Sequence, residues 1–371
     1  MNFQRYPFAE VHMINIVIGT RPEIIKMSPV IRECTKQGLE YLVVHTGQHY
    51  SYAMDRIFFE QLGLPFPEYN LDVGSGTHGA QTAAILSGIE NILIKRPAGI
   101  VLVQGDTNTV CAGALAAVKL HIPVGHIEAG LRSFDRSMPE EINRIIADHV
   151  SDQLYAPTPI SRQNLLNEGI NTEKITVTGN TVVDAVQQNI KIAQHKVHPL
   201  EKLGLEPRKY FLVTAHRVEN VDDPVCLAKI LTALKKLSEH FELPLVFPMH
   251  PRTQKMVREF SLSTEGFRVI DPVGYLEFLL LESNAALLLT DSGGVQEEGC
   301  ILSVPCVTLR ENTERPETIE VGSNMLAGTN AEKILAAADQ MIETRRNWNN
   351  PFGNGDAAHS IIEICKKHGT L

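Results

Sequence analysis

The stretch Asp291-Ser292-Gly293-Gly294-Val295-Gln296-Glu297-Glu298 joins a predicted buried strand to a predicted helix. The apolar run 285–289 indicates the strand, and residues 299–302 continue the helix. Two glycines at this turn would let a ligand approach the backbone closely. The first N–H groups of a helix lack intrahelical partners, and the helix dipole favours negative charge there. The stretch therefore predicts an anion site, most naturally for phosphate, although a tight turn that needs glycine only for its own geometry has the same pattern.

Strand and helix patterns alternate along the rest of the chain, which is typical of parallel βαβ units. The polar stretch 191–209 shows no clear element. The fold class is therefore predicted as α/β, with two Rossmann-like doubly wound parallel-sheet domains around a cleft. We place these domains at 1–175 and 176–355, and we expect a C-terminal helix within 356–371 to pack back on the first domain. The expected strands are 13–18, 42–45, 100–104, 123–127, 154–156, 175–178, 210–214, 243–247, 267–270, 285–289 and 304–309.

Composition and charge limit the classes of partner and compartment. The net charge of −9 over 371 residues argues against a nucleic acid or a membrane surface as the partner. No apolar run reaches the roughly 18 residues of a membrane-spanning helix, and residues 1–12 lack the layout of a signal peptide. The six cysteines are scattered without CxxC spacing, which is typical of reduced core residues in a cytoplasmic protein. The histidine and cysteine spacings predict no metal site.

Charged residues collect at the predicted carboxyl ends of the strands, where ligands bind in open parallel sheets. The same regions hold several arginines, whose guanidinium groups suit bidentate contacts with phosphate. Because both halves of the chain show this pattern, we expect one cleft that binds a phosphorylated ligand. The residues at the strand ends are Arg21, His49, Asp106, Glu128, His216, His250, Asp291 and Ser292, and the nearby cations are Lys26, Arg144, Arg252 and Arg315.

The predicted helix after residue 139 carries two charged residues with an ordinary structural interpretation. Glu140 and Arg144 are four residues apart, which fits a surface ion pair, and the helix dipole favours a first-turn glutamate. From spacing alone we favour this interpretation over a catalytic one. Ile142, Ile145 and Ile146 follow at helical spacing, with residue 150, and predict the buried face of the helix.

The other acids and the histidine differ in how strongly they suggest a functional role. Asp106 could simply cap the helix that follows it. Glu128 ends a strand where no helix begins, so we favour a functional role for it. His216 suits a structural and a site histidine equally. Several carboxylates near a histidine in a closed cleft would allow proton transfer at carbon.

The glycine-rich stretch 74–79 has the form G-x-G-x-x-G, which indicates a dinucleotide site when it follows the first strand of a βαβ unit. The preceding residues 68–72 do not have the pattern of a buried parallel strand, and the motif is not in the first unit. We interpret it as a flexible loop before a helix, and no cofactor is predicted.

In its motifs the chain resembles the non-hydrolysing UDP-N-acetylglucosamine 2-epimerases from residue 13 onward. That family has the glycosyltransferase-B fold, with two Rossmann-like domains around a cleft, and works as a homodimer. The resemblance implies C2 epimerisation of UDP-GlcNAc and UDP-ManNAc, by anti elimination of UDP to 2-acetamidoglucal and syn re-addition, without nicotinamide. The motifs, in order, are GTRPEIIK (19–26), TGQH (46–49), QGDTNT (104–109), GHIEAGLRS (125–133), MPEEINR (138–144), TGNTVVDA (178–185), TAHRVEN (214–220), DSGGVQEE (291–298) and NTERPE (312–317).

The resemblance also implies roles for individual residues. For Glu140 it overrides the ion-pair interpretation, and it does not identify which carboxylate removes the C2 proton. Glu298 would hold the ribose hydroxyls, while Arg21, Ser292 and the following N–H groups would hold phosphate. The implied catalytic residues are Asp106, Glu128, Glu140 and His216. The implied substrate-binding residues are Arg21, Lys26, His49, Arg144, His250, Ser292, Gly293, Gly294, Glu298 and Arg315.

Alternative activities remain open at the level of sequence. Many bacterial members of the family need substrate in a second pocket that uses an arginine, and residues 71–79 contain none. Close relatives epimerise UDP-2,3-diacetamido-2,3-dideoxyglucuronate, whereas the plain GTRPE and TERPE motifs favour UDP-GlcNAc here. A glycosyltransferase of the same fold, a hydrolysing 2-epimerase and a non-enzymatic nucleotide-sugar sensor are the other candidates. The family resemblance implies that the product serves synthesis of a surface polysaccharide or glycan.

Overall fold

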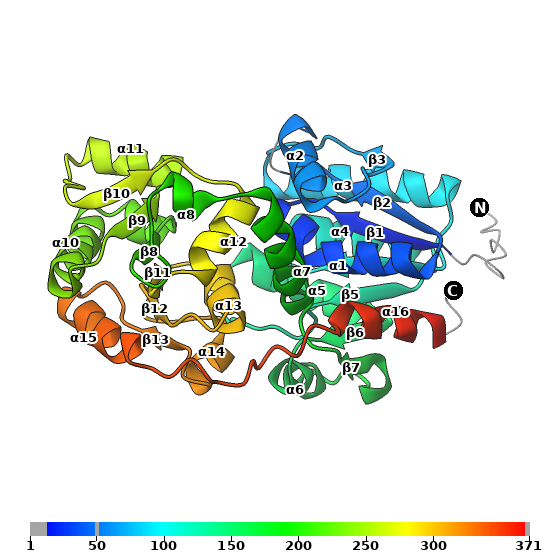
Figure 1. Cartoon of the computed structure of the whole chain (residues 1–371). Helices are drawn as coiled ribbons and strands as arrows, with labels where there is room; N and C mark the ends of the chain where they lie inside the picture. The colour runs from blue at the N-terminus through cyan, green and yellow to red at the C-terminus, as the bar shows by residue number, and fades with distance from the viewer. Residues whose placement is uncertain (1–12, 49–51, 368–371) are drawn as a thin grey trace. The chain divides into compact units, whose positions relative to one another are not determined.

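The computed structural model describes residues 13–48 and 52–367, and for residues 52–55 it describes the backbone alone. The chain forms two compact units. The first unit extends to Ala185 and resumes at Phe352, and the second comprises Val186–Pro351. Each unit contains its own parallel sheet flanked by helices (Figure 1). This confirms the predicted fold class of two Rossmann-like doubly wound domains.

The first unit contains a seven-stranded sheet with the order β3-β2-β1-β4-β5-β6-β7, and every adjacent pair is parallel. The order reverses between β1 and β4, which is where open α/β sheets bind ligands. The strands are β1 (Ile14–Ile18), β2 (Tyr41–His45), β3 (Tyr69–Asn70), β4 (Ile100–Gln104), β5 (Val124–Ile127), β6 (Gln153–Ala156) and β7 (Ile175–Val177). The helices are α1 (Arg21–Gln37), α2 (Tyr52–Leu62), α3 (His78–Lys95), α4 (Asn108–Lys119), α5 (Pro139–Val150), α6 (Pro159–Asn167), the 3-10 helix η1 (Thr172–Lys174) and α16 (Ala357–Lys367).

The second unit repeats this topology with six parallel strands in the order β10-β9-β8-β11-β12-β13, so its reversal lies between β8 and β11. Its strands are β8 (Phe211–Thr214), β9 (Leu245–Pro248), β10 (Phe267–Ile270), β11 (Leu287–Thr290), β12 (Cys306–Thr308) and β13 (Asn324–Leu326). Its helices are α8 (Pro199–Lys202), α9 (Val218–Val221), α10 (Pro224–Phe241), α11 (Pro251–Glu259), α12 (Tyr275–Ser283), α13 (Gly293–Ile301), α14 (Pro316–Glu320) and α15 (Ala331–Ile342).

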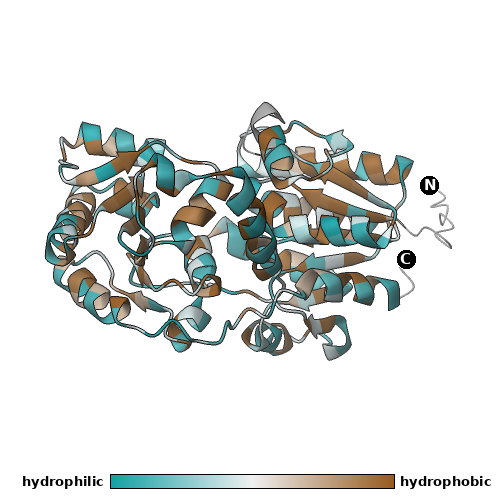
Figure 2. Cartoon of the chain, viewed as in Figure 1, coloured by the Kyte–Doolittle hydropathy of each residue, from teal (hydrophilic) through white to brown (hydrophobic). Residues whose placement is uncertain are grey.

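Burial of the central strands explains why they read as continuous apolar runs. Every residue of β1, β4 and β11 is buried, as expected for a parallel sheet covered by helices on both faces. Figure 2 shows β1 as mostly hydrophobic, while the helices carry hydrophilic residues along much of their length. Each sheet therefore holds the ends of its central strands in fixed positions, and the candidate site residues follow those ends.

The transition between the units lies in α7 (Thr181–Lys196), which begins in the first unit and continues into the second. The predicted boundary at 175/176 falls at the start of β7, which pairs with β6 in the first sheet. The prediction that 191–209 contains no element is wrong, because α7 extends through the first part of this range and α8 follows. In its last turns α7 buries Ala193 and exposes most of its other residues, so its apolar pattern is weak.

Helix α5 buries the face opposite to the predicted one. Its buried residues are Glu141, Arg144, Ala147 and Asp148, whereas the three isoleucines are only partly buried. Apolar periodicity predicted the wrong face because the charged residues of α5 find partners inside the unit. A buried charge is tolerated when it is paired and hydrogen-bonded.

The C-terminal helix α16 packs against α1 in the first unit (Figure 1). Asp184 accepts hydrogen bonds from the backbone N–H of Ala357 and Ala358, at 3.3 and 3.0 Å, and so caps the first turn of α16. His359 Nδ1 lies 3.0 Å from Glu33 Oε1 of α1. Burial is the largest influence on Asp184 and raises its pKa from 3.8 to about 6.

Replacing Asp184 by asparagine should change how stability depends on pH. Because the pKa of Asp184 is higher in the folded state, the folded protein keeps a proton that the unfolded chain loses, and the free energy of unfolding falls as pH rises from about 4 to 6. Asparagine still caps the helix but does not titrate. Urea unfolding at pH 4 and 7 gives the free energy of unfolding of both proteins. The value for Asp184→Asn minus that for the unmodified chain should be larger at pH 7 than at pH 4 by on the order of 2 to 3 kcal/mol.

The control for this pH effect is Asp271→Asn, a change at an exposed aspartate. Its free energy of unfolding should depend on pH in the same way as that of the unmodified chain. If that of Asp184→Asn also depends on pH in this way, the pKa of Asp184 is not raised in the folded protein.

Candidate functional site

At the reversal point of the first sheet, the turn after β1 is closely packed. A Cβ on Gly19 would collide with the hydroxyls of Thr46 and Thr109, which hydrogen-bond each other at 2.8 Å. Arg21 is the first residue of α1, and its guanidinium lies over the Phe58 ring, 4.9 Å from the centroid. Of the sequence-predicted site residues, His49 lies outside the described residues.

Glu23 lies at the same turn and was not selected from the sequence. Its carboxylate accepts hydrogen bonds from the N–H of Gly19 and Thr20, at 2.5 and 2.9 Å, and from the Thr107 hydroxyl at 2.5 Å. Burial is the largest influence and raises its pKa from 4.5 to about 7, against the opposing hydrogen bonds. The signal available in the sequence is the capping-box spacing of Thr20 and Glu23. This carboxyl joins the turns after β1 and β4.

Glu128 follows β5 and is held from three sides. Lys26 Nζ lies 2.6 Å from its Oε1, Asn180 Nδ2 donates to Oε1 at 2.9 Å, and the Gln104 amide donates to Oε2. The Glu128 side chain is 4% exposed, and its backbone has a φ of 68°. A left-handed conformation is costly for a residue with a Cβ and persists where the surroundings enforce it. The arrangement favours an ionised carboxylate in a fixed orientation.

Asp106 follows β4 and pairs with Arg144 of α5. Arg144 Nη1 also lies 3.0 Å from Glu141, whose carboxylate is almost fully buried. Thr107, and not Asp106, occupies the N-cap position of α4, so the capping interpretation of Asp106 is wrong. The i,i+4 interpretation is wrong too, since among the described residues the partners of Arg144 are Asp106 and Glu141, not Glu140.

A cavity of about 260 Å³ lies beside these groups in the first unit. Glu140 lines it together with Asn143, whose amide donates to the backbone carbonyl of Asp106 at 3.0 Å. Glu140 therefore lies near Asp106, at the carboxyl ends of the strands of the first sheet. The remaining lining residues are Gln48, Ser75, Gly76, His78, Gln81, Thr107, Asn108 and Pro139.

The glycine stretch 74–79 contributes three of these lining residues, and it does not have the position of a dinucleotide-binding loop. It follows the two-residue edge strand β3, not the first strand of the sheet. A Cβ on Gly74, Gly76 or Gly79 would meet nothing within 4 Å. These glycines are therefore not required by close packing, which supports the loop interpretation.

At the reversal point of the second sheet, Asp291 organises the turn after β8. It is fully buried, and its Oδ2 accepts from the N–H of His216 and Arg217 at 2.9 and 3.0 Å and from Asn220 Nδ2 at 3.1 Å. Its Oδ1 lies 3.2 Å from His216 Nδ1. Burial would raise the pKa of Asp291, but His216 and these N–H groups lower it. An ionised Asp291 therefore orients the half-exposed imidazole of His216.

A second cavity of about 240 Å³ opens beside this turn. His216, His250 and Ser292 line it, so the structure brings these three predicted residues together. The two imidazole centroids are 6.1 Å apart. Burial, followed by the charges of His216 and Arg252, lowers the pKa of His250, which favours a neutral ring.

The N-terminus of α13 lies at this cavity, and its backbone conformation bears on the two interpretations of its glycines. Ser292 is the N-cap, and Gly293 and Gly294 begin the helix. Neither glycine has a positive φ, so the turn itself does not require glycine. Without a Cβ at these positions the first N–H groups stay accessible to a ligand, and this supports the phosphate-site interpretation.

Two further predicted residues lie close to α13. Arg315 pairs with Glu297, with 2.7 Å between Nε and Oε1, and the Glu297 side chain is 1% exposed. Glu298 is near the buried residues Tyr275 and Glu282 of α12. Burial and then the charge of Glu298 raise the pKa of Glu282, so this carboxyl is held neutral beside Glu298.

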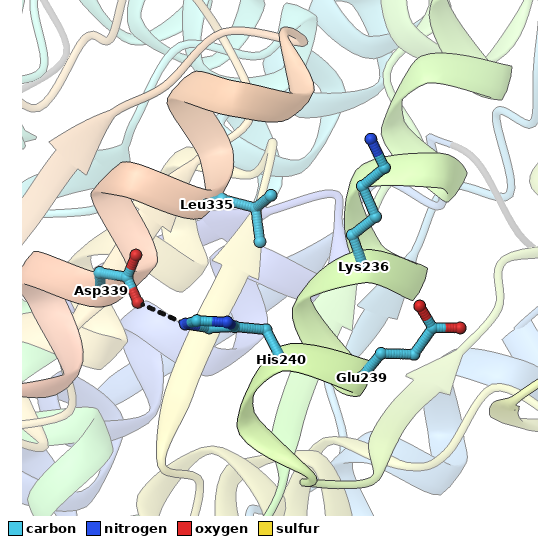
Figure 3. A pocket seen from close by; sticks show the side chains of 5 residues that line it. All are labelled: Lys236, Glu239, His240, Leu335 and Asp339. Atoms are coloured by element: carbon cyan, nitrogen blue, oxygen red, sulfur yellow. Dashed lines mark hydrogen bonds and ion pairs between the residues drawn. The ribbon is translucent and has the colours of Figure 1, made fainter.

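A larger hollow of about 470 Å³ lies in the second unit between α10 and α15, and Figure 3 shows the side chains that line it. It is lined by Lys236, Glu239, His240, Leu335 and Asp339, none of which is a predicted site residue. His240 Nε2 and Asp339 Oδ1 are 3.0 Å apart, and both side chains are more than half exposed. This hollow is a solvated surface feature with a single ion pair.

Residues 13–48 and 52–367 contain no group of three or more histidine, cysteine, aspartate or glutamate side chains that could hold a metal ion. In that part of the chain no helix combines the length and the apolar character needed to cross a membrane. All six cysteines are free thiols.

Comparison with known proteins gives consistent matches over nearly the whole chain. The family model described as UDP-N-acetylglucosamine 2-epimerase matches residues 32–366. A UDP-N-acetylglucosamine 2-epimerase of Methanococcus maripaludis is 55% identical, over 95% of this chain and 98% of its own. The UDP-GlcNAc 2-epimerase of Methanocaldococcus jannaschii, solved in complex with UDP-GlcNAc and UDP, superimposes with a TM-score of 0.87 at 54% identity, covering 96% of this chain and 99% of its own. The UDP-2,3-diacetamido-2,3-dideoxy-D-glucuronate 2-epimerase of Pseudomonas aeruginosa is 44% identical over 95% of this chain and 98% of its own.

Proposed function

The chain belongs to the UDP-N-acetylglucosamine 2-epimerase family, and from this premise we propose that it interconverts UDP-GlcNAc and UDP-ManNAc. The observation that carries the proposal is the N-terminus of α13, whose glycines lack positive φ values and lie beside His216, His250 and Ser292. Such an N-terminus suits a diphosphate, and UDP-sugars contain one.

In this proposal the second unit binds the uridine diphosphate. Ser292 and the N–H groups of Gly293 and Gly294 hold the diphosphate, while the N–H of Ser292 itself donates to the Thr290 hydroxyl at 2.9 Å. Glu298 accepts hydrogen bonds from the ribose hydroxyls. Arg315 and His250 complete this set, and Arg21 and His49 are the proposed phosphate-binding residues of the first unit. Lys26 and Arg144 pair with carboxylates, so we assign them to orienting Glu128 and Asp106 and not to direct phosphate contact.

The first unit supplies the groups that handle the proton at C2. In the forward direction a carboxylate removes that proton, the electron pair forms the C1–C2 double bond, and the C1–O bond breaks so that UDP leaves with its bonding electrons. Return of a proton to the other face of C2 and re-addition of UDP complete the inversion. Asp106, Glu128 and Glu140 are the proposed acid–base groups. His216, oriented by Asp291, is proposed to stabilise the charge on departing UDP.

The main alternative substrate is UDP-2,3-diacetamido-2,3-dideoxyglucuronate, because a relative named for it is 44% identical. The higher identities, 54% and 55%, belong to relatives named for UDP-GlcNAc and favour the N-acetyl sugar. We further propose that the enzyme acts as a homodimer in the cytoplasm, without a cofactor, and that it supplies activated ManNAc for a surface polysaccharide or glycan.

Proton NMR of the purified protein with UDP-GlcNAc in D₂O tests this function directly. The expected result is the appearance of UDP-ManNAc together with loss of the sugar H2 signal, because the proton returned to C2 comes from solvent. Release of free ManNAc and UDP would instead identify a hydrolysing enzyme. If UDP-GlcNAc binds but does not react, while the diacetamido-uronate is epimerised, the alternative substrate is correct.

A further inference from the structure

A carboxylate already lies at the proposed diphosphate site. Oε1 of Glu314 is 3.3 Å from the point that a Cβ on Gly293 would occupy, at the first turn of α13. Glu314 lies in the segment between β12 and α14, and its side chain is 15% exposed. The helix N-terminus that suits a phosphate thus has a built-in anion beside it.

The same carboxylate is paired with two arginines of the second unit. Arg217 Nη2 lies 2.7 Å from Oε1 of Glu314, and Arg310 Nη1 lies 2.8 Å from Oε2. The side chains of Arg217 and Arg310 are 24% and 11% exposed. Each oxygen of Glu314 therefore takes one charged hydrogen bond of the kind that a phosphate oxygen would otherwise accept.

The charge on Glu314 is present at every pH at which the enzyme is expected to work. Burial alone would raise its pKa, but Arg315, Arg217 and Arg310 lower it to about 2. A ligand phosphate at α13 consequently meets a permanent negative charge as well as the helix N–H groups. A phosphate bound at the first turn of α13 would be repelled by this carboxylate, because like charges that are close together in a partly buried site interact strongly.

We propose that Glu314 determines the charge selectivity of the nucleotide site by weakening the binding of free UDP relative to ligands with less negative charge. The inference rests on the proposed function. Elimination breaks the C1–O bond and leaves its electron pair on the β-phosphate oxygen, so free UDP carries more negative charge than the UDP-sugar. Glu314 opposes this extra charge and limits how tightly UDP is retained.

Calorimetric titration with UDP and with uridine tests the role of this charge. Glu314→Gln removes the charge and keeps an oxygen that accepts from arginine. It should tighten UDP binding about 10-fold and leave uridine binding within about 2-fold, because uridine is uncharged. The matched control is Glu219→Gln. Glu219 also faces Arg217, at 3.5 Å, but its side chain is 59% exposed, so UDP affinity should change by less than about 2-fold.

Unchanged or weaker UDP binding by a folded Glu314→Gln protein would overturn the inference. Parallel weakening of UDP and uridine would show that Glu314 serves only to hold the arginines. Glu314→Asp provides a second variant that keeps the charge but withdraws it from Gly293, and its UDP affinity should lie between those of the unmodified and glutamine proteins. If the unmodified protein itself binds no UDP, the proposed function fails, and not this inference alone.

Discussion

Glu128→Gln should lower the rate of epimerisation at least about 100-fold while UDP binding persists. Glutamine has nearly the same shape, and it retains an oxygen that can accept from Asn180 or Gln104, but it can neither accept nor return the C2 proton. The measurement is single-turnover conversion of UDP-GlcNAc, followed by NMR, together with exchange of H2 in D₂O. Loss of both conversion and exchange indicates that proton transfer itself has stopped.

The structure indicates which control this variant needs. Glutamine leaves the ammonium of Lys26 without its carboxylate partner, and that lysine side chain is only 15% exposed. Thermal unfolding and UDP titration must therefore accompany the kinetic measurement. Glu173→Gln, at an exposed glutamate of η1, should leave turnover unchanged. Turnover close to that of the unmodified protein in Glu128→Gln would exclude Glu128 from the chemical step.

Asp148→Asn should cause the largest loss of stability, about 3 to 5 kcal/mol. The Asp148 carboxylate is fully buried and interacts with His126 Nδ1 and with Arg132 Nη1, each at 2.7 Å. It also accepts from the N–H of Gly130 at 3.1 Å. The asparagine variant removes the anion that His126 and Arg132 share. Arg132 keeps its pair with Glu168, at 2.7 Å, but the buried His126 loses its carboxylate partner, and this cost exceeds that of losing one hydrogen bond. Denaturant unfolding at pH 7 gives the free-energy difference.

Asp339→Asn is the matched control for this stability measurement. Asp339 also pairs with a histidine, His240, but at the surface shown in Figure 3, where such a pair contributes less than about 1 kcal/mol. The pKa of Asp148 is lowered in the folded state, since His126 and Arg132 outweigh its burial. The loss of unfolding free energy caused by Asp148→Asn should therefore become smaller as the pH falls into the acid range, because protonation of Asp148 removes its charge in the unmodified chain as well. A loss below about 1 kcal/mol at pH 7 would contradict the assigned role.

The turn at 128–130 connects these two predictions. Asp148 fixes the N–H of Gly130, two residues after Glu128, and Glu128 has an unfavourable backbone conformation. A buried charge network on α5 and β5 thus supports the conformation that orients a proposed catalytic carboxylate. None of these pairings follows from periodicity, because a buried aspartate on a helix has the same sequence pattern as an exposed one.

Several features of this protein follow from the sequence alone, because they depend on neighbouring residues. The apolar run before Asp291 and the glycines after it predict a strand, a turn and a helix N-terminus, and all three occur. The alternation of strands and helices predicts parallel sheets, and it places Asp106, Glu128 and His216 at strand ends. The edge strands β3 and β13 were not among the expected strands, because they have two and three residues, which is too few for a dependable periodic signal.

The tertiary structure alone decided which charges meet. Lys26 pairs with Glu128 across 102 residues of sequence, and Arg144 selects Asp106 across 38, although Glu140 is only four residues away. In the same way Glu23 acquires its raised pKa from burial between two turns, and Glu314 reaches Gly293 from a separate loop. Local spacing determines which residues share an element. Electrostatic energy depends on distances and burial that exist only after the strands have assembled, so the pairing of these side chains could not be read from their order in the chain.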